Sequence, residues 1–170
     1  MRNIIAIIII VISLLGFSFL SNLLNNRIEN ENENGRWIME MAIYPSGGQS
    51  GFDYLIQIDK NNVIRTRFGA RTQITVRTID ESFFSKVYEE EERKLNEEEL
   101  QRVLSLAKKL EATDGIMELE IALGSWEVVL KYRGVMYGMD YGASHFEPLR
   151  NLATEIMKLS PIEVELHGWS

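Results

Sequence analysis

The chain opens with an apolar run that decides how much of it is left to build a water-soluble fold. From Ile4 to Leu24 no residue carries a charge, and the run is interrupted only by Ser13, Gly16, Ser18, Ser21 and Asn22. A helix rises about 1.5 Å per residue, so a helix of this length spans a hydrocarbon core of about 30 Å. The run therefore predicts a transmembrane helix, within residues 1–24, that acts as an uncleaved signal anchor.

A cleaved secretory signal peptide is the alternative interpretation of the same run. Arg2 and the amino terminus form a short positive region, and Gly16-Phe17-Ser18 offers small residues where a signal peptidase cuts. The run continues past that site to Leu24, which favours retention, whereas cleavage would release a secreted protein. Because the tail before the run is short, we expect a single-pass protein of the cell membrane with its carboxy-terminal domain extracytoplasmic.

The rest of the chain is expected to contain a spacer and one domain. Residues 25–35, NNRIENENENG, have almost no apolar content and predict a disordered polar stalk. Removing the first 24 of 170 residues leaves 146, enough for one hydrophobic core. The chain has no cysteine, so neither a disulfide nor a lipoprotein anchor can form. We therefore expect an extracytoplasmic domain over residues 36–170 that depends on its core for stability.

A first β-hairpin is predicted where residues 52–59 and 63–70 flank a three-residue loop. That register sets Ile58 opposite Ile64 and collects apolar side chains on one face, with Asn62 suited to a left-handed turn position. Further strands are expected on either side of this hairpin, over residues 36–44 and 73–79.

A second hairpin is predicted where residues 126–132 and 135–141 flank a two-residue loop. The eight positions paired on one face are all apolar or aromatic. On the other face the same register sets Glu127 opposite Asp140. Like charges directly across a ladder are unfavourable. We expect these two side chains to splay into water at the open end of the hairpin.

Two helices complete the predicted domain. Asn96 and Glu99 match a capping box, and the apolar residues that follow recur at helical spacing as far as Asp114-Gly115. A second helix is expected to start near Pro148 and to stop at Ser160-Pro161, before a short strand over 162–166. The segment 83–94 fits either a solvated helix or an extended arm. The fold class predicted is α+β, an antiparallel sheet packed against two helices.

No cluster of reactive side chains marks a catalytic or metal site. His145 and His167 have no metal-ligand spacing, and no local motif surrounds a nucleophile. We therefore expect no catalytic residue, no metal and no cofactor, and a non-catalytic binding or interaction module. The alternative is a small envelope hydrolase that uses His145 with Asp140 or Glu147.

A basic strip in this acidic chain is the first candidate binding surface. The formal net charge is −7, which argues against nucleic acid as a partner. Arg65 and Arg67 share the outer face of the first hairpin, and Arg71 and Arg77 follow close by. Such a strip suits an anionic group of an envelope protein or a wall polymer. The alternative is that the arginines pair with the chain's own glutamates over 89–92.

A glycine-rich loop at residues 45–51 is the second candidate surface. Its sequence, PSGGQSG, predicts a tight or mobile loop, and mobile loops are where binding residues tend to lie. The residues proposed to bind are Ser46, Gly47, Gly48 and Gln49. The order of hairpin, helix, hairpin and helix after the SGG loop resembles small proteinaceous protease inhibitors of the emfourin type. That resemblance implies, as an alternative function, an inhibitor that presents the 45–51 loop to a protease.

Overall fold

The computed structural model describes residues 36–46, 52–72, 79, 82–113, 115, 117–118, 126–141 and 145–166. The chain divides into two units, residues 1–36 and 37–170, and all described strands and helices belong to the second. The expected membrane segment and stalk lie outside the described residues. Among the helices that are described, none has the length and apolar character needed to cross a membrane.

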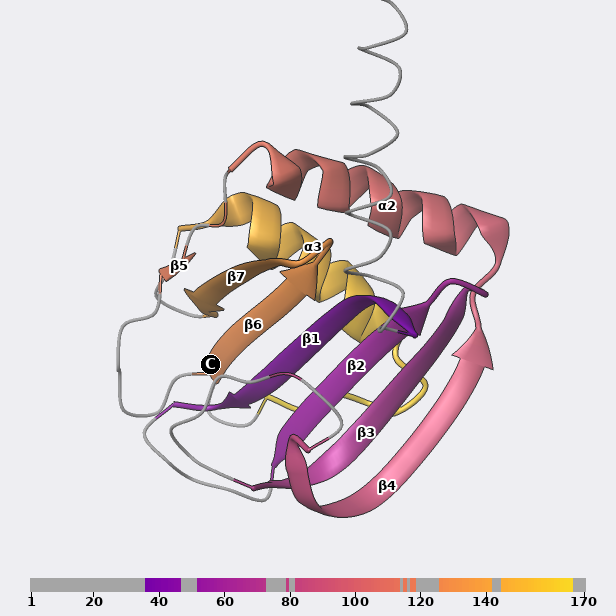
Figure 1. The fold of residues 1–170 in the computed structure, drawn as a ribbon, viewed down its shortest axis with the longest axis vertical. Coiled ribbons are helices and arrows are strands. Elements are labelled where there is room, and N and C mark those ends of the chain that lie inside the picture. The colour runs from indigo at the N-terminus through magenta and orange to yellow at the C-terminus, as the bar shows by residue number, and fades with distance from the viewer. Residues whose placement is uncertain are drawn as a thin grey trace, which may run out of the picture. The chain divides into compact units, whose positions relative to one another are not determined.

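One sheet of seven strands forms the frame of the domain, in the order β4-β3-β2-β1-β6-β7-β5 (Figure 1). Its first six strands in that order pair antiparallel, and the short β5 joins β7 in parallel. The antiparallel sheet is therefore confirmed, with β5 as an addition. The strand bounds are β1 Trp37–Pro45, β2 Asp53–Asp59, β3 Val63–Arg71, β4 Phe84–Lys94, β5 Met117–Glu118, β6 Trp126–Tyr132 and β7 Val135–Asp140.

Two helices, α2 (Glu97–Glu111) and α3 (Glu147–Leu159), cover one face of the sheet (Figure 1). The predicted capping box is confirmed: Asn96 Oδ1 accepts from the Glu99 N–H, and Glu99 Oε2 accepts from the Asn96 N–H, both at 2.9 Å. Each helix buries one apolar stripe. The buried residues are Leu100, Val103, Ala107 and Leu110 in α2, and Leu149, Leu152, Ala153, Ile156 and Leu159 in α3.

Both predicted hairpin registers are confirmed. Ile58 lies opposite Ile64 and Asn62 has a φ of 65°, as a left-handed turn position requires. In the second hairpin, Arg133 and Gly134 both have positive φ, 49° and 78°, which matches the twist of the flanking strands.

The outcome differs among three other segments for which the sequence predicted a structure. The ambiguous segment 83–94 is extended and forms β4, whereas the expected strand over 73–79 falls almost wholly outside the described residues. The predicted strand over 162–166 is wrong: these residues are irregular. Ile162 is buried, and Val164 and Leu166 pack against the core. Burial of these apolar side chains holds the segment without any strand pairing.

The face of the sheet opposite the helices is also covered. Side chains alternate between faces along a strand, so Met41 and Ile43 of β1 lie in the helix-side core while Ala42 and Tyr44 belong to a second cluster. Ile79 and Phe83, from the connection between β3 and β4, are buried in that second cluster. This second face carries most of the buried polar and charged side chains.

Candidate binding surface at the loop end of the sheet

The two ends of the sheet differ in how the strands are joined. Tight turns at 60–62 and 133–134 close one end. The other end, called the loop end below, is where β1, β3, β5 and β7 finish and where β2, β4 and β6 begin. A rigid frame that gathers long connections at one end is a common base for a binding surface.

The connection between β1 and β2 is fixed at both of its ends. Ser46 is buried, and its hydroxyl donates to Glu127 Oε1 at 3.4 Å. Asp53 is fully buried; its Oδ1 lies 2.8 Å from Arg71 Nε and its Oδ2 accepts from the Arg71 N–H at 3.1 Å. Beside these anchors Phe52 is 51% exposed. The candidate residues Gly47, Gly48 and Gln49 lie outside the described residues.

The arginines of the predicted basic strip are mostly buried. Arg65, Arg67 and Arg71 are 8%, 6% and 5% exposed. Arg65 donates to Gln57 Oε1 from Nε at 3.2 Å and from Nη2 at 2.7 Å, and Arg67 Nη2 donates to the same oxygen at 3.3 Å. Arg65 Nη1 also lies 3.6 Å from Glu90 Oε1. For Arg65, pairing with the chain's own glutamates over 89–92 is therefore confirmed.

Aromatic rings cover the same guanidinium groups. The Arg65 guanidinium lies 4.3 Å from the Trp37 ring centroid, and that of Arg71 lies 4.1 Å from the Tyr44 ring centroid. Cation–π contact and burial fix these groups in place. The charges of Arg65, Arg67 and Arg71 are therefore largely engaged within the domain. Arg77 lies outside the described residues.

The carboxylates Glu127 and Asp140 lie opposite each other, as predicted, but the expected splaying into water is wrong. Glu127 is 7% exposed and Asp140 is 1% exposed. Glu127 Oε1 also accepts from the hydroxyl of Ser46, which directly follows β1. The sequence of a single hairpin does not include such neighbouring segments, so it did not predict the burial of the two carboxylates.

The geometry around His145 does not favour the hydrolase hypothesis. His145 is exposed immediately before α3, and its carbonyl accepts from the Glu147 N–H at 2.7 Å. Within the described part of the chain, its side chain forms no hydrogen bond or ion pair with a carboxylate. A groove of about 600 Å³ lies beside α3, and His145 does not line it. The lining residues are Tyr141, Thr154, Met157, Lys158, Ser160, Pro161, Glu163, Val164 and Leu166.

No group of three or more metal-ligating side chains gathers in the ranges that the structure describes. His167 lies outside those ranges. The domain combines buried charged side chains, anchored strand ends and exposed aromatic side chains. These features suit protein recognition.

An aromatic row that the sequence analysis missed crosses three strands on the helix side of the sheet. The ring centroids of Tyr54 and Phe68 are 4.9 Å apart, and those of Phe68 and Tyr88 are 5.8 Å apart. Tyr88 ends the row on β4 and is 51% exposed. The sequence contains a hint of this row, because Val87 and Tyr88 directly precede the glutamates over 89–92. Whether Tyr88 could join a row of aromatic side chains depended on whether this segment formed a strand.

Several carboxylates lie close enough to Tyr54, the buried end of this aromatic row, to affect its pKa. Burial raises the pKa of Tyr54, and a hydrogen bond from the Glu165 N–H at 3.3 Å opposes the rise. The negative charges of Glu165, Glu89 and Glu163 add to it. The row is therefore set in a negative field.

No protein-family model matches the chain, and no curated protein matches it.

Proposed function

We propose that residues 36–170 form a non-catalytic, extracytoplasmic protein-binding module held at the cell membrane by residues 1–24. The module contacts its partner through the connection between β1 and β2 and through Phe52. The observation that carries this proposal is half-exposed Phe52, which directly precedes the anchored Asp53 in a connection whose other end is held by Ser46.

An exposed aromatic ring on a rigid frame is well suited to binding another protein. Aromatic side chains supply much of the binding energy of interfaces, because they remove a large apolar area from water. Rigid flanks lower the entropy lost on association. Arg71 supports this surface through its ion pair with Asp53, and Arg65 and Arg67 are buried within the domain, so an anionic wall polymer is the weaker choice of partner.

Site-specific photo-crosslinking tests the proposed surface. A photoreactive phenylalanine analogue replaces Phe52 in the full chain in intact cells, and the same analogue replaces Val135 as the control. Val135 is a matched position because it is 41% exposed, apolar and at the opposite end of the sheet. We expect one discrete adduct from position 52 and none of that mass from position 135.

A companion variant separates contact from folding. Phe52→Ser removes an exposed ring, so the urea unfolding midpoint should stay close to that of the wild type. The yield of the adduct, recorded from a photoreactive residue at Gln49, should fall about tenfold. Equal adducts from positions 52 and 135 would contradict the proposal.

A protease inhibitor is the second candidate, and the two anchored ends of the β1–β2 connection favour it. A loop held at both ends meets a protease active site in a preorganised form. The full chain in detergent should then inhibit one protease of a panel that covers the serine, cysteine and metalloprotease classes. Replacing residues 47–50 with alanine should abolish the inhibition. A panel with no inhibited protease rejects this candidate and leaves the general binding proposal standing.

A further inference from the structure

The strand β4 forms an edge of the sheet. Among the described strands it pairs with β3 alone, and it is 11 residues long. Register shifts interrupt the ladder near Gly69 and Arg71, but from Glu89 to Lys94 the pairing with β3 is continuous. Every second residue of such an edge directs its backbone N–H and C=O away from the sheet, where another strand can pair.

The side chains of this edge combine negative charge with exposed apolar surface. Glu89 and Glu91 are exposed and pair across the ladder with Phe68 and Thr66 on the helix side of the sheet. Tyr88 is 51% exposed at the end of the aromatic row. These three residues, Tyr88, Glu89 and Glu91, are called the acidic edge below.

A cation already lies over the aromatic member of the acidic edge. Lys86 Nζ is 5.4 Å from the Tyr88 ring centroid, within the range of a cation–π contact. Glu89 and Glu163 both contribute negative charge around nearby Tyr54. The local field therefore attracts positively charged side chains.

Charge decides which occupant the edge accepts. A second copy of this chain, paired antiparallel about the centre of the Glu89–Glu92 run, would set glutamate opposite glutamate, which is unfavourable. A strand with positive side chains places opposite charges across the new ladder. Its lysines or arginines can also reach the Tyr88 ring.

We infer that the exposed edge of β4 pairs with an extended segment of the partner protein that carries lysine or arginine side chains. The segment adds a strand to the sheet: backbone hydrogen bonds to β4 supply affinity, and Tyr88, Glu89 and Glu91 select positive charge. This inference rests on the proposed protein-binding function for the existence of a partner. Its test uses a defined peptide.

Fluorescence polarisation with labelled peptides tests the edge on the full chain in neutral detergent. The probe is a peptide of alternating lysine and valine, long enough to cover Glu89–Lys94. Peptides of alternating glutamate and valine, and of lysine and valine with alternate backbone nitrogens methylated, serve as comparisons. We expect the lysine peptide to bind at least about tenfold more tightly than either, because it alone combines positive charge with free backbone donors.

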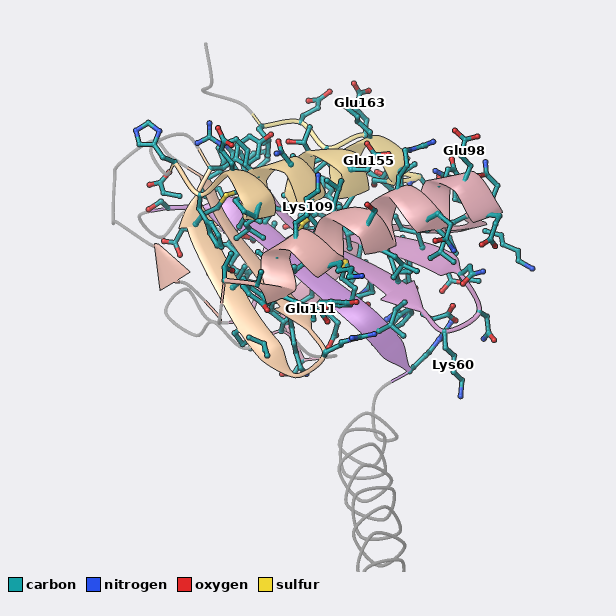
Figure 2. All side chains as sticks on the ribbon, turned by 90° about the horizontal axis from the view of Figure 1, so that it is seen from above. Lys60, Glu98, Lys109, Glu111, Glu155 and Glu163 are labelled. Carbon is teal, nitrogen blue, oxygen red and sulfur yellow. The ribbon has the colours of Figure 1, made fainter. Side chains whose placement is uncertain are left out.

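Two double variants connect the binding to this edge. Glu89→Lys with Glu91→Lys should weaken binding of the lysine peptide about tenfold. The control, Glu111→Lys with Glu155→Lys, makes the same change of net charge on α2 and α3, where Figure 2 shows both residues. The affinity of this control variant for the lysine peptide should lie within about twofold of that of the wild type, because neither residue belongs to β4.

Three results would overturn the inference. These are equal affinity for the lysine and methylated peptides, equal loss in both double variants, or β4-mediated dimers of the chain in sedimentation. Failure of the inference and failure of the proposed function are distinguishable. Crosslinking at Phe52 does not depend on the peptide, and peptide binding does not depend on the native partner.

Discussion

At the scale of single residues, the buried pair of Asp53 and Arg71 holds the loop end together. Asp53 is fully buried: its Oδ2 accepts a hydrogen bond from the Arg71 backbone N–H, and its Oδ1 forms an ion pair with Arg71 Nε at 2.8 Å. Removing one partner of a buried pair leaves the other charge uncompensated. Asp53→Asn should therefore lower the free energy of unfolding by about 3 kcal/mol in urea denaturation.

A pair of controls makes that measurement specific. Arg102→Gln removes an exposed arginine that pairs with Glu98 and Glu155, and it should move the urea midpoint far less. In a double-mutant cycle, Arg71→Met should recover part of the loss in the Asp53→Asn background. If the Asp53→Asn midpoint matches that of Arg102→Gln, the pair does not hold the loop end.

Also at the residue scale, the close approach of β3 and β4 leaves no room for a side chain at Gly69. A Cβ at this position would lie 2.2 Å from the Lys86 carbonyl oxygen, which is backbone and cannot move aside. Gly69→Ala should therefore cost about 1–3 kcal/mol of unfolding free energy, as overpacking does. Gly134→Ala is the matched control, since no atom lies within 4 Å of its Cβ and only its φ of +78° is strained. A smaller loss at Gly69 than at Gly134 would contradict the close packing of β3 on β4.

At the scale of elements, the start of α2 is stabilised by a carboxylate that makes the domain sensitive to acid. A hydrogen bond from Arg93 and a second from the Asn96 N–H lower the pKa of Glu99 below its ordinary value of 4.5. The folded-state pKa is thus below the unfolded one. Glu99 stabilises the fold above pH 4.5, and this contribution is lost as the pH falls through the lowered pKa.

A pH series of urea midpoints checks this prediction. The wild type should lose stability below pH 4.5, and Glu99→Gln should lose less over the same range because it has no carboxylate to protonate. Asn96→Ala should cost about 1 kcal/mol at neutral pH, since it removes the N-cap. Parallel pH profiles for the wild type and Glu99→Gln would show that other groups cause the acid sensitivity.

At the scale of the whole molecule, the membrane anchor is the prediction with the largest consequence. Because the apolar run passes the Gly16-Phe17-Ser18 site without a break, we expect the chain to keep it and to stay in the membrane pellet after an alkaline wash. Mass spectrometry of the purified chain should show an intact amino-terminal segment. A mature chain that begins at Phe19 would instead identify a cleaved signal peptide and a secreted domain.

Much of the fold was predictable from the sequence because it depends on local patterns. The register of each hairpin follows from alternation of apolar residues around a short turn, and Asn62 and Arg133-Gly134 mark those turns. The start of α2 follows from Asn96 and Glu99, which are three residues apart. In each case the interacting groups are close in the chain.

The candidate site was harder to predict because its properties depend on segments far apart in the chain. The alternation along β3 placed Arg65 and Arg67 on one face, but their burial depends on contacts with Gln57 and Trp37 from other strands. Likewise, the exposure of Tyr88 depends on β4 being at the edge of the sheet.

The sequence by itself determined the α+β class, the two hairpins and the helix starts, because turns, caps and periodicity act over a few residues. Only the tertiary structure decided that the second face of the sheet is covered. Arg65, Arg67 and Arg71 are buried, and so are Glu127 and Asp140, whose pairing across the hairpin the sequence had already predicted. The physical reason is that the solvent exposure of a side chain depends on every segment that packs on it. The local sequence around a residue does not indicate which distant segments these are.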